Sequence, residues 1–231
     1  GGVASWTTGN RCTYTNKLTG TGSITVYCAT EKGNGWYATR TPIQLNLLDF
    51  AGTFIPQATY AESSVFTFDT SNGMPKGTMS IPETITVLNH GKTFEIGRLD
   101  GKGKLGGFCS FNNNGETGSN TWVVGNDEDW SWFGVVTGSG TAFTKVGEGK
   151  MTVRGKWDNN GAVRVNEGEL CLNNGTLGTG SLVVAKGATL SGRTGDDLTN
   201  SAFTINGTCH VGATETATSG SIEFGNKNVT F

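Results

Sequence analysis

The sequence predicts an all-β chain in which short strands stack as the coils of a parallel β-solenoid, and three observations indicate it. Short apolar runs recur between Val136 and Gly192, at Met151–Val153, Val163–Val165 and Leu182–Val184, each followed by a Gly-containing turn. Gly accounts for 37 of the 231 residues and Pro for 4, while 35% of residues are hydrophobic, so turns and a packed core are both available. No amphipathic helix of three or more turns is apparent.

The first 90 residues predict short strands that give way to a less regular section. The segments TYTNKL, SITVYC and IQLNLLDF alternate apolar with polar residues or run apolar for a few positions. Pro56, Pro75 and Pro82 follow the last of these. Proline removes a ladder donor, so we expect all three in loops or at strand starts. Residues 1–90 are therefore expected to form irregular coils or a capping section.

From Phe94 the pattern tightens, and residues 94–192 form the clearest repeat section. The motif apolar-x-Gly-x-Gly-x-apolar begins at Leu18, Leu99 and Val136, and a copy one residue shorter begins at Leu177. The second Gly of each copy falls at positions 22, 103, 140 and 180. The intervals between these positions are near multiples of a coil of about 20 residues. We expect each Gly pair to turn a corner, with the flanking apolar residues pointing into one core.

The repeat section resembles the autotransporter-associated β-strand repeat, a motif that alternates Gly with apolar residues. The matching residues are Phe133, Gly134, Val136, Gly138, Gly140, Phe143, Lys145, Gly147, Gly149, Met151, Val153, Gly155, Val165, Gly168, Leu170, Leu182, Val184, Gly187, Ala188 and Leu190. The resemblance implies a right-handed parallel β-helix in a secreted or surface-displayed bacterial protein, often an adhesin. The motif is structural and implies no catalytic residue. We therefore expect one right-handed, single-stranded parallel β-helix over residues 1–231, with about ten coils of roughly 20–25 residues.

Charge and hydropathy exclude some classes of partner. The chain has 17 basic and 19 acidic residues, a net charge of -2, which provides no electrostatic footprint for nucleic acid and no basic face for an anionic membrane. No apolar run approaches the roughly 18 residues that would span a bilayer. The oligomeric state and the export route stay open.

The most prominent candidate for a ligand site is the acidic segment Asp127-Glu128-Asp129-Trp130-Ser131-Trp132. Exposed Trp130 and Trp132 would stack on the apolar face of a sugar while the carboxylates accept hydrogen bonds from its hydroxyls. Calcium is a second alternative, because hard oxygen ligands are clustered, but neither an EF-hand spacing nor a calcium-binding repeat is present, and no metal ligand is assigned. The structural alternative is a corner loop in which Trp132 or Phe133 fills the core and the acids face water.

Enzymatic chemistry finds less support. Asp196 and Asp197 are the candidates for a glycoside hydrolase, which uses two carboxylates, but adjacent residues of a strand point to opposite faces. His90 and His210 lack a supporting motif, and no G-x-S-x-G occurs. Lys102 and Lys104 beside Asp100 do not specify a lyase, and solvated turn charges explain them. We assign no catalytic residue and expect no cofactor.

Cysteine and asparagine residues each leave two alternatives. The five cysteines, Cys12, Cys28, Cys109, Cys171 and Cys209, contain no C-x-x-C pair, so a zinc site is not expected. Cys12 and Cys28 could pair in an exported protein, and buried thiols are the other interpretation. Residues 112–114 and 173–174, all Asn, predict turns or an asparagine ladder inside the solenoid.

The expected function is a structural and adhesive module of an exported bacterial protein, secreted or at the cell surface. Loops such as 112–120 and 126–132 would contact a glycan or a host or cell surface. The alternative is a carbohydrate-active β-helix enzyme, a polysaccharide hydrolase or lyase.

Overall fold

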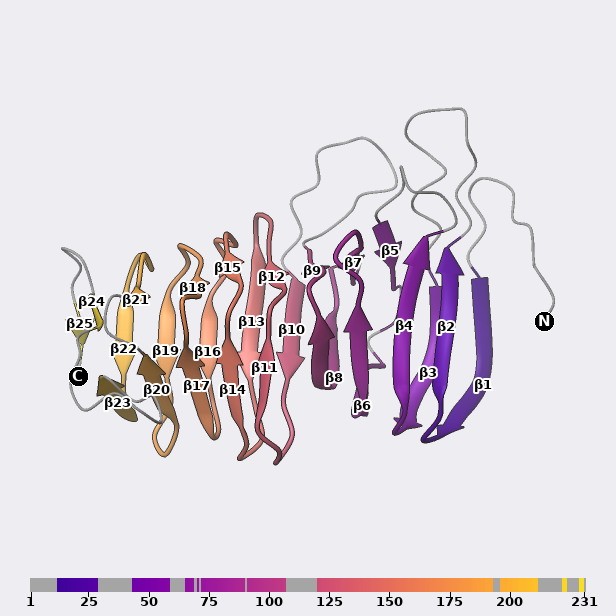
Figure 1. Ribbon diagram of the computed structural model, residues 1–231, viewed down its shortest axis with the longest axis horizontal. Helices are drawn as coiled ribbons and strands as arrows, with labels where there is room; N and C mark the ends of the chain where they lie inside the picture. The colour runs from indigo at the N-terminus through magenta and orange to yellow at the C-terminus, as the bar shows by residue number, and fades with distance from the viewer. Residues whose placement is uncertain are drawn as a thin grey trace.

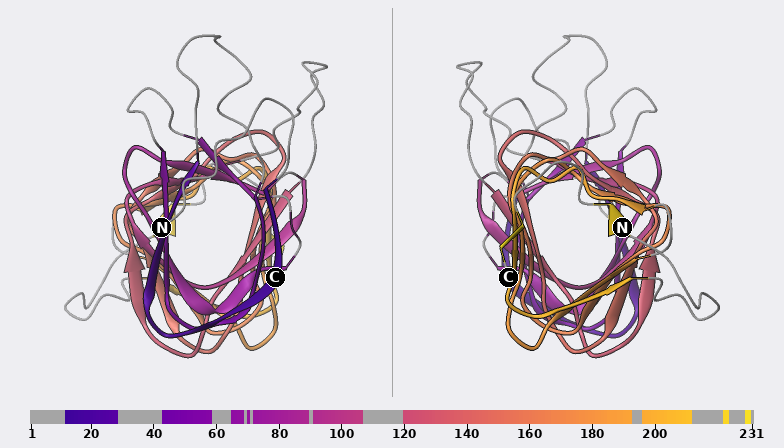
Figure 2. Two further views of the ribbon diagram at one scale, coloured as in Figure 1. Left: turned by 90° about the vertical axis from the view of Figure 1, so that its right-hand side faces the viewer. Right: turned by 90° about the vertical axis from the view of Figure 1, so that its left-hand side faces the viewer.

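The computed structural model describes residues 12–28, 43–58, 65–68, 70, 72–89, 91–106, 120–192, 196–211, 222–223 and 229–230. All regular structure in these residues is β-strand, and every strand pairing is parallel, which confirms the predicted all-β fold and parallel β-helix. The coils stack along the long axis from the N-terminal to the C-terminal end (Figure 1), and seen end-on they enclose one common interior (Figure 2).

The chain passes over three faces in each coil. The first face holds β10 (Asn120–Val124), β13 (Thr141–Lys145), β16 (Val163–Val165), β19 (Leu182–Val184), β22 (Phe203–Ile205) and β25 (Val229–Thr230). The second face holds β2 (Ser23–Cys28), β4 (Thr53–Ala58), β11 (Trp130–Trp132), β14 (Lys150–Val153), β17 (Glu169–Leu172), β20 (Thr189–Gly192) and β23 (Thr208–Val211). The third face holds β5 (Val65–Thr67), β7 (Thr86–Leu88), β9 (Lys104–Leu105), β12 (Val135–Val136), β15 (Lys156–Trp157), β18 (Thr176–Leu177), β21 (Asp196–Asp197) and β24 (Ile222–Glu223).

The remaining strands connect the first and second faces. β1 (Cys12–Gly20) pairs with β3 (Ile43–Phe50), and these two strands precede β2 and β4. β6 (Met74–Ile81) and β8 (Thr93–Gly101) turn a corner within their own length, near Gly77 and Gly97. The first half of β8 pairs with β10, whereas its second half pairs with the second half of β6. Because both strands bend, one continuous sheet joins β2 and β4 to the strands of the first face.

Strand register gives the length of each coil. On the first face Trp122 pairs with Phe143, Phe143 with Val163, Val163 with Leu182 and Leu182 with Phe203. Successive coils in this part of the chain therefore take about 20 residues each, as the sequence repeat predicts. Nearer the N-terminal end, on the second face, Ile24 pairs with Phe54 and Phe54 with Met79, so the coils there are longer.

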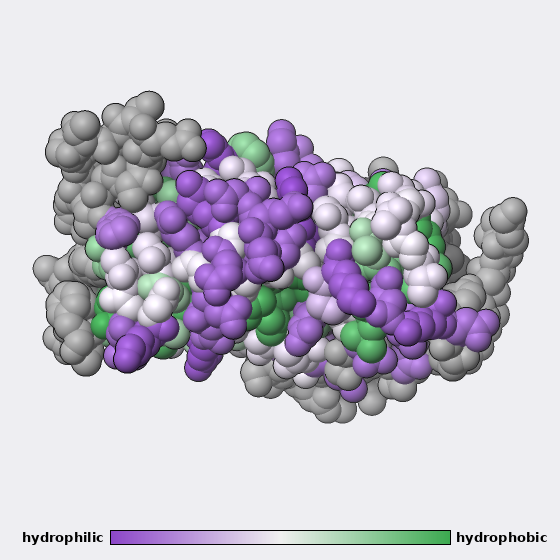
Figure 3. Space-filling view, turned by 90° about the horizontal axis from the view of Figure 1, so that it is seen from below, coloured by the Kyte–Doolittle hydropathy of each residue, from purple (hydrophilic) through white to green (hydrophobic). Residues whose placement is uncertain are grey.

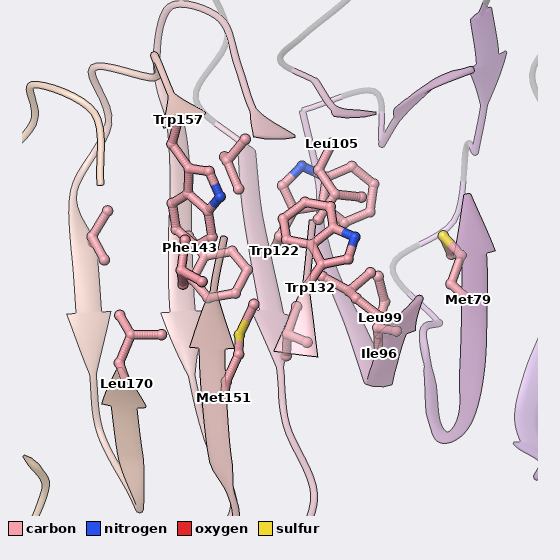
Figure 4. Packing of buried hydrophobic residues seen from close by; sticks show 14 of the residues in the cluster. Met79, Ile96, Leu99, Leu105, Trp122, Trp132, Phe143, Met151, Trp157 and Leu170 are labelled. Atoms are coloured by element: carbon pink, nitrogen blue, oxygen red, sulfur yellow. The ribbon is translucent and has the colours of Figure 1, made fainter. Parts of the chain in front are cut away.

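The core consists of columns of stacked side chains that point into the interior. One column on the first face contains Phe94, Trp122, Phe143, Val163, Leu182 and Phe203, all at most 1% exposed. Figure 4 shows Trp122, Phe143 and Trp157 together inside the coils, and the Phe143 and Trp157 ring centroids lie 4.6 Å apart. Outward positions between the inward ones are more exposed: Glu95 and Arg164 face water, and Val123 and Val183 are partly exposed. This alternation is what a strand with one buried face requires.

The Gly-x-Gly motif marks corners, but the four copies lie at three different corners. Gly20 and Gly22 join the first face to the second, whereas Gly101 and Gly103 join the second to the third. The copies at positions 138 to 140 and 178 to 180 both join the third face to the next coil, two coils apart. Only the interval between these last two copies therefore measures whole coils, and the interpretation of all the intervals as coil multiples is wrong.

Pro56 corrects a second prediction, because it lies inside β4 rather than in a loop or at a strand start. The pairing of β4 with β6 covers Thr53 and Phe54 only, while β4 pairs with β2 along its whole length. Proline has no N–H to donate, but β4 does not pair with β6 beyond Phe54. Pro56 therefore interrupts no pairing with β6, and a strand tolerates proline at such an unpaired edge. Pro75 lies at the start of β6 and Pro82 directly after its end, as predicted.

Buried asparagines do form a set inside the coils, but with other residues than predicted. Asn89, Asn120, Asn159 and Asn200 are at most 1% exposed, and each side-chain amide donates to a backbone carbonyl at 2.8 to 3.2 Å. Residues 112–114 lie outside the described residues. Asn174 has a φ of 61°, which agrees with the predicted turn.

Candidate functional site

The acidic segment forms a corner between the first and second faces. Asp127, Glu128 and Asp129 are exposed there, and the chain then enters β11. Glu148 and Glu167 occupy the same corner in the next two coils, and we call these five residues the acidic corner. Figure 3 views this side of the molecule and shows hydrophilic residues crowded along its middle.

Three carboxylates of the acidic corner bind backbone N–H groups of an adjacent coil. The Glu148 N–H donates to Asp127 Oδ1 at 3.2 Å, and the Lys150 N–H donates to Asp129 Oδ1 at 2.7 Å. The Gly147 N–H donates to Glu167 Oε2 at 2.7 Å. Hydrogen bonds to a charged acceptor are stronger than neutral ones. The acidic side chains thus join one coil to the next at a turn where the strand ladder is interrupted.

A buried cation lies beneath this corner. Lys145 occupies an inward position of β13, between Val124 and Val165 in a column of apolar residues, and is fully buried. Its Nζ donates to the carbonyl oxygens of Val146 at 2.8 Å and Gly147 at 2.7 Å, and it lies 5.6 Å from the centroid of the Trp130 ring. Burial lowers the pKa of Lys145 to about 8, against the opposing effect of the nearby carboxylates.

Trp130 and Trp132 are buried, which removes the basis for their predicted stacking on a sugar. They are 5% and 0% exposed, because alternate residues of β11 point into the core. Trp130 lies over Lys145, and the Trp132 ring centroid lies 5.9 Å from that of Trp157. Both rings therefore fill the coil interior, as in the structural alternative, while the three acids face water.

Phe133 is the exposed aromatic ring at the end of this segment, with 53% of its surface accessible. It precedes Gly134, and the Arg154 guanidinium of the next coil lies 5.4 Å from the centroid of its ring. Sequence reasoning considered Phe133 only as a core residue. The signal that it missed is the β11 alternation, since two buried Trp residues at 130 and 132 require the side chain of residue 133 to point outward.

Phe133 belongs to a corner where glycines stack in four successive coils. Gly103, Gly134, Gly155 and Gly175 form this glycine column between the second and third faces. A Cβ on Gly134 would overlap the Gly103 carbonyl oxygen, and one on Gly155 would overlap the Gly134 carbonyl oxygen. The Thr176 N–H donates to the Gly155 carbonyl at 3.2 Å. Only glycine lets the backbones approach this closely.

The other predicted chemical residues are not brought together. Asp196 and Asp197 lie in β21 on the third face, while His210 is exposed on β23 of the second face, and residue 90 lies outside the described residues. Cys171 is buried, and burial raises the pKa of the half-buried Cys209 thiol. The side chains of residues 12, 28 and 109 lie outside the described part. Among the described residues no cluster of His, Cys, Asp and Glu is placed to hold a metal ion.

Within the described residues, no helix has the length and hydropathy needed to cross a membrane. Comparison of the chain with protein-family models, with curated proteins and with solved structures found no match.

Proposed function

We propose that this chain is a structural and adhesive segment of an exported bacterial protein, secreted or at the cell surface, of the autotransporter-associated repeat type. It acts as a rigid rod that presents its corners and loops to a glycan or to a host or cell surface. The observation that carries this proposal is the use of carboxylates: those of Asp127, Asp129 and Glu167 bind backbone N–H groups of an adjacent coil. Acidic side chains used in this way support a scaffold rather than a reaction.

The stacking of the coils supports the same role. The longest sheet among the described strands runs in one continuous order from β2 to β25. Its strand steps of about 4.8 Å give a rod of about 43 Å for this part of the chain. Each coil contacts its neighbours through parallel ladders and columns of buried side chains, so a load along the rod is shared by many bonds. Such a rod holds its surface groups at fixed positions along one axis.

Binding and turnover assays on one panel of polysaccharides test the proposal. The expected result is retention on a subset of the glycans without release of reducing ends. Turnover that is lost in Asp127→Ala or Asp196→Ala would instead support a polysaccharide hydrolase or lyase. Absence of binding to every glycan and to every cell surface tested would contradict the adhesive part of the proposal.

A further inference from the structure

Positive charge flanks the glycine column in the coils before and after Phe133. Lys102 and Lys104 lie on either side of Gly103, and Arg154 and Lys156 lie on either side of Gly155. All four basic residues are exposed. The corner between the second and third faces is therefore basic, whereas the corner between the first and second faces is acidic.

Strand register places these side chains in two rows parallel to the rod axis. Lys104 pairs with Val135 in the next coil. The Asp158 N–H donates to the Val136 carbonyl at 3.1 Å, which places Lys156 beside Val135 on its other side. On the opposite edge of the glycine column, the Arg154 N–H donates to the Trp132 carbonyl at 2.9 Å, so Arg154 follows Phe133.

The four charges are not neutralised within the described part of the chain. Among the described residues, no carboxylate lies within ion-pair distance of Lys102, Lys104, Arg154 or Lys156. By contrast, Lys17 and Lys76 each form an ion pair with Asp49, and Arg98 lies 3.5 Å from Glu128. Clustered cations without partners repel each other and favour an anion that bridges them.

The Phe133 ring supplies an apolar contact between the two pairs of charges. Arg154 lies over the ring, and the ring still has 53% of its surface exposed. An exposed aromatic ring can stack on the apolar face of a sugar ring. The glycines of the column are themselves buried, so a ligand at this corner would contact the exposed side chains that flank them.

The spacing of the charges selects among polyanions. The Lys102 and Lys104 pair lies two coil steps from the Arg154 and Lys156 pair, about 10 Å along the rod. Duplex DNA carries one charge per about 1.7 Å of its axis, far denser than these two pairs. A polysaccharide with isolated carboxylate or sulfate groups has sparser charges and offers sugar rings between them.

We propose that the exposed side chains that flank the glycine column, Lys102, Lys104, Phe133, Arg154 and Lys156, form a binding site for an acidic polysaccharide that runs parallel to the rod axis. The two basic pairs bind successive acidic groups, and Phe133 contacts the sugar between them. This inference rests on the proposed function, because it names the glycan class and the site for the adhesive role.

The test measures binding of the full chain to κ-carrageenan, to polygalacturonate and to neutral dextran. The two acidic probes distinguish sulfate from carboxylate recognition. We expect Arg154→Gln with Lys156→Gln to weaken binding to the preferred acidic probe at least tenfold, about 1.4 kcal/mol. Phe133→Ala should weaken it roughly fivefold. The matched control, Arg164→Gln with Lys186→Gln, removes the same charge from exposed positions away from this corner and should change binding less than about twofold.

Three results would overturn the site. These are equal loss in the double variant and its control, tighter binding of single-stranded DNA of matched charge than of either polysaccharide, and no binding of either acidic probe. Circular dichroism checks that each variant keeps its β-structure. If wild type binds other glycans while the acidic probes fail, the proposed adhesive function stands and only this site is refuted. If no glycan or cell surface binds, the adhesive function fails as well.

Discussion

Replacing Lys145 by Met should change how the stability of the protein depends on pH. Lys145 stacks between Val124 and Val165 in the core, and its ammonium group donates to the Val146 and Gly147 carbonyls. Methionine keeps a similar length without the charge. At pH 7 the variant removes the cost of burying a cation but also loses the hydrogen bonds, so these effects oppose each other at a single pH.

The pH dependence separates these effects. The pKa of Lys145 falls from 10.5 to about 8 on folding, a difference of about 3 kcal/mol that solvent beyond the corner partly screens. Below pH 8 both folded and unfolded chains bind this proton, and the cost of burial is constant. Between pH 8 and 10.5 the folded chain has released the proton that the unfolded chain still holds, so the stability of wild type rises with pH.

Urea unfolding at pH 7 and at pH 10 measures the effect. Wild type should gain about 2 kcal/mol relative to Lys145→Met between these two pH values. Lys186→Met, which removes an exposed ammonium, should differ from wild type by less than about 0.5 kcal/mol in the same comparison. A Lys145→Met variant that follows wild type at both pH values would refute the burial of this ammonium.

Further substitutions test the packing and the N-terminal ion pairs. Phe143→Ala should lower the free energy of unfolding by about 4 kcal/mol, because the Phe143 ring fills the core. Phe133→Ala should lower it by less than about 0.5 kcal/mol in the same denaturant unfolding. Equal effects would contradict the inward orientation of Phe143 in β13. Gly155→Ala should destabilise the protein by about 3 kcal/mol or more, since its Cβ would overlap a carbonyl oxygen of the adjacent coil. Gly22→Ala, whose Cβ would meet nothing within 4 Å, should be nearly neutral in the same thermal unfolding. The opposite order would disprove the glycine column. Hydrogen bonds from two lysines lower the pKa of Asp49 to about 2. The contribution of Asp49 to stability should therefore be present above about pH 4 and disappear as pH falls through 2. A carboxyl ¹³C titration of Asp49 with a midpoint near 4 would contradict this pairing.

Sequence pattern predicted the fold class because the solenoid repeats one local rule. Val163, Val165, Leu182 and Val184 alternate with outward residues in the sequence. All four side chains are buried in the structure, as this alternation predicts. The corners were less predictable, since a Gly pair turns the chain equally well between any two faces. The motif at Gly101 and the one at Gly138 look alike in sequence yet join different faces.

The site depended on information that one segment of sequence does not contain. Trp130 and Trp132 beside three acids fit an exposed ligand loop as well as a strand start, and only the stacking of β11 on β14 places both rings inside. Lys145 reads as a surface charge until its alternation with Phe143 is counted. The basic corner needed the register between coils, because Lys102 and Arg154 are distant in sequence and meet only through the stacking around Phe133.

Deletion of one coil tests the parallel stacking most directly. Val163 pairs with Leu182, so removing residues 163–181 places Leu182 beside Phe143 and restores every column one coil shorter. In a solenoid each coil contacts only its neighbours, and this deletion should leave a cooperatively folded β-protein. Deleting residues 163–172 removes half a coil. The strands that follow would then stack on strands of a different face, so this deletion should abolish cooperative unfolding. Cooperative unfolding after the half-coil deletion, or a chain that fails to fold after the full-coil deletion, would contradict the stacked register.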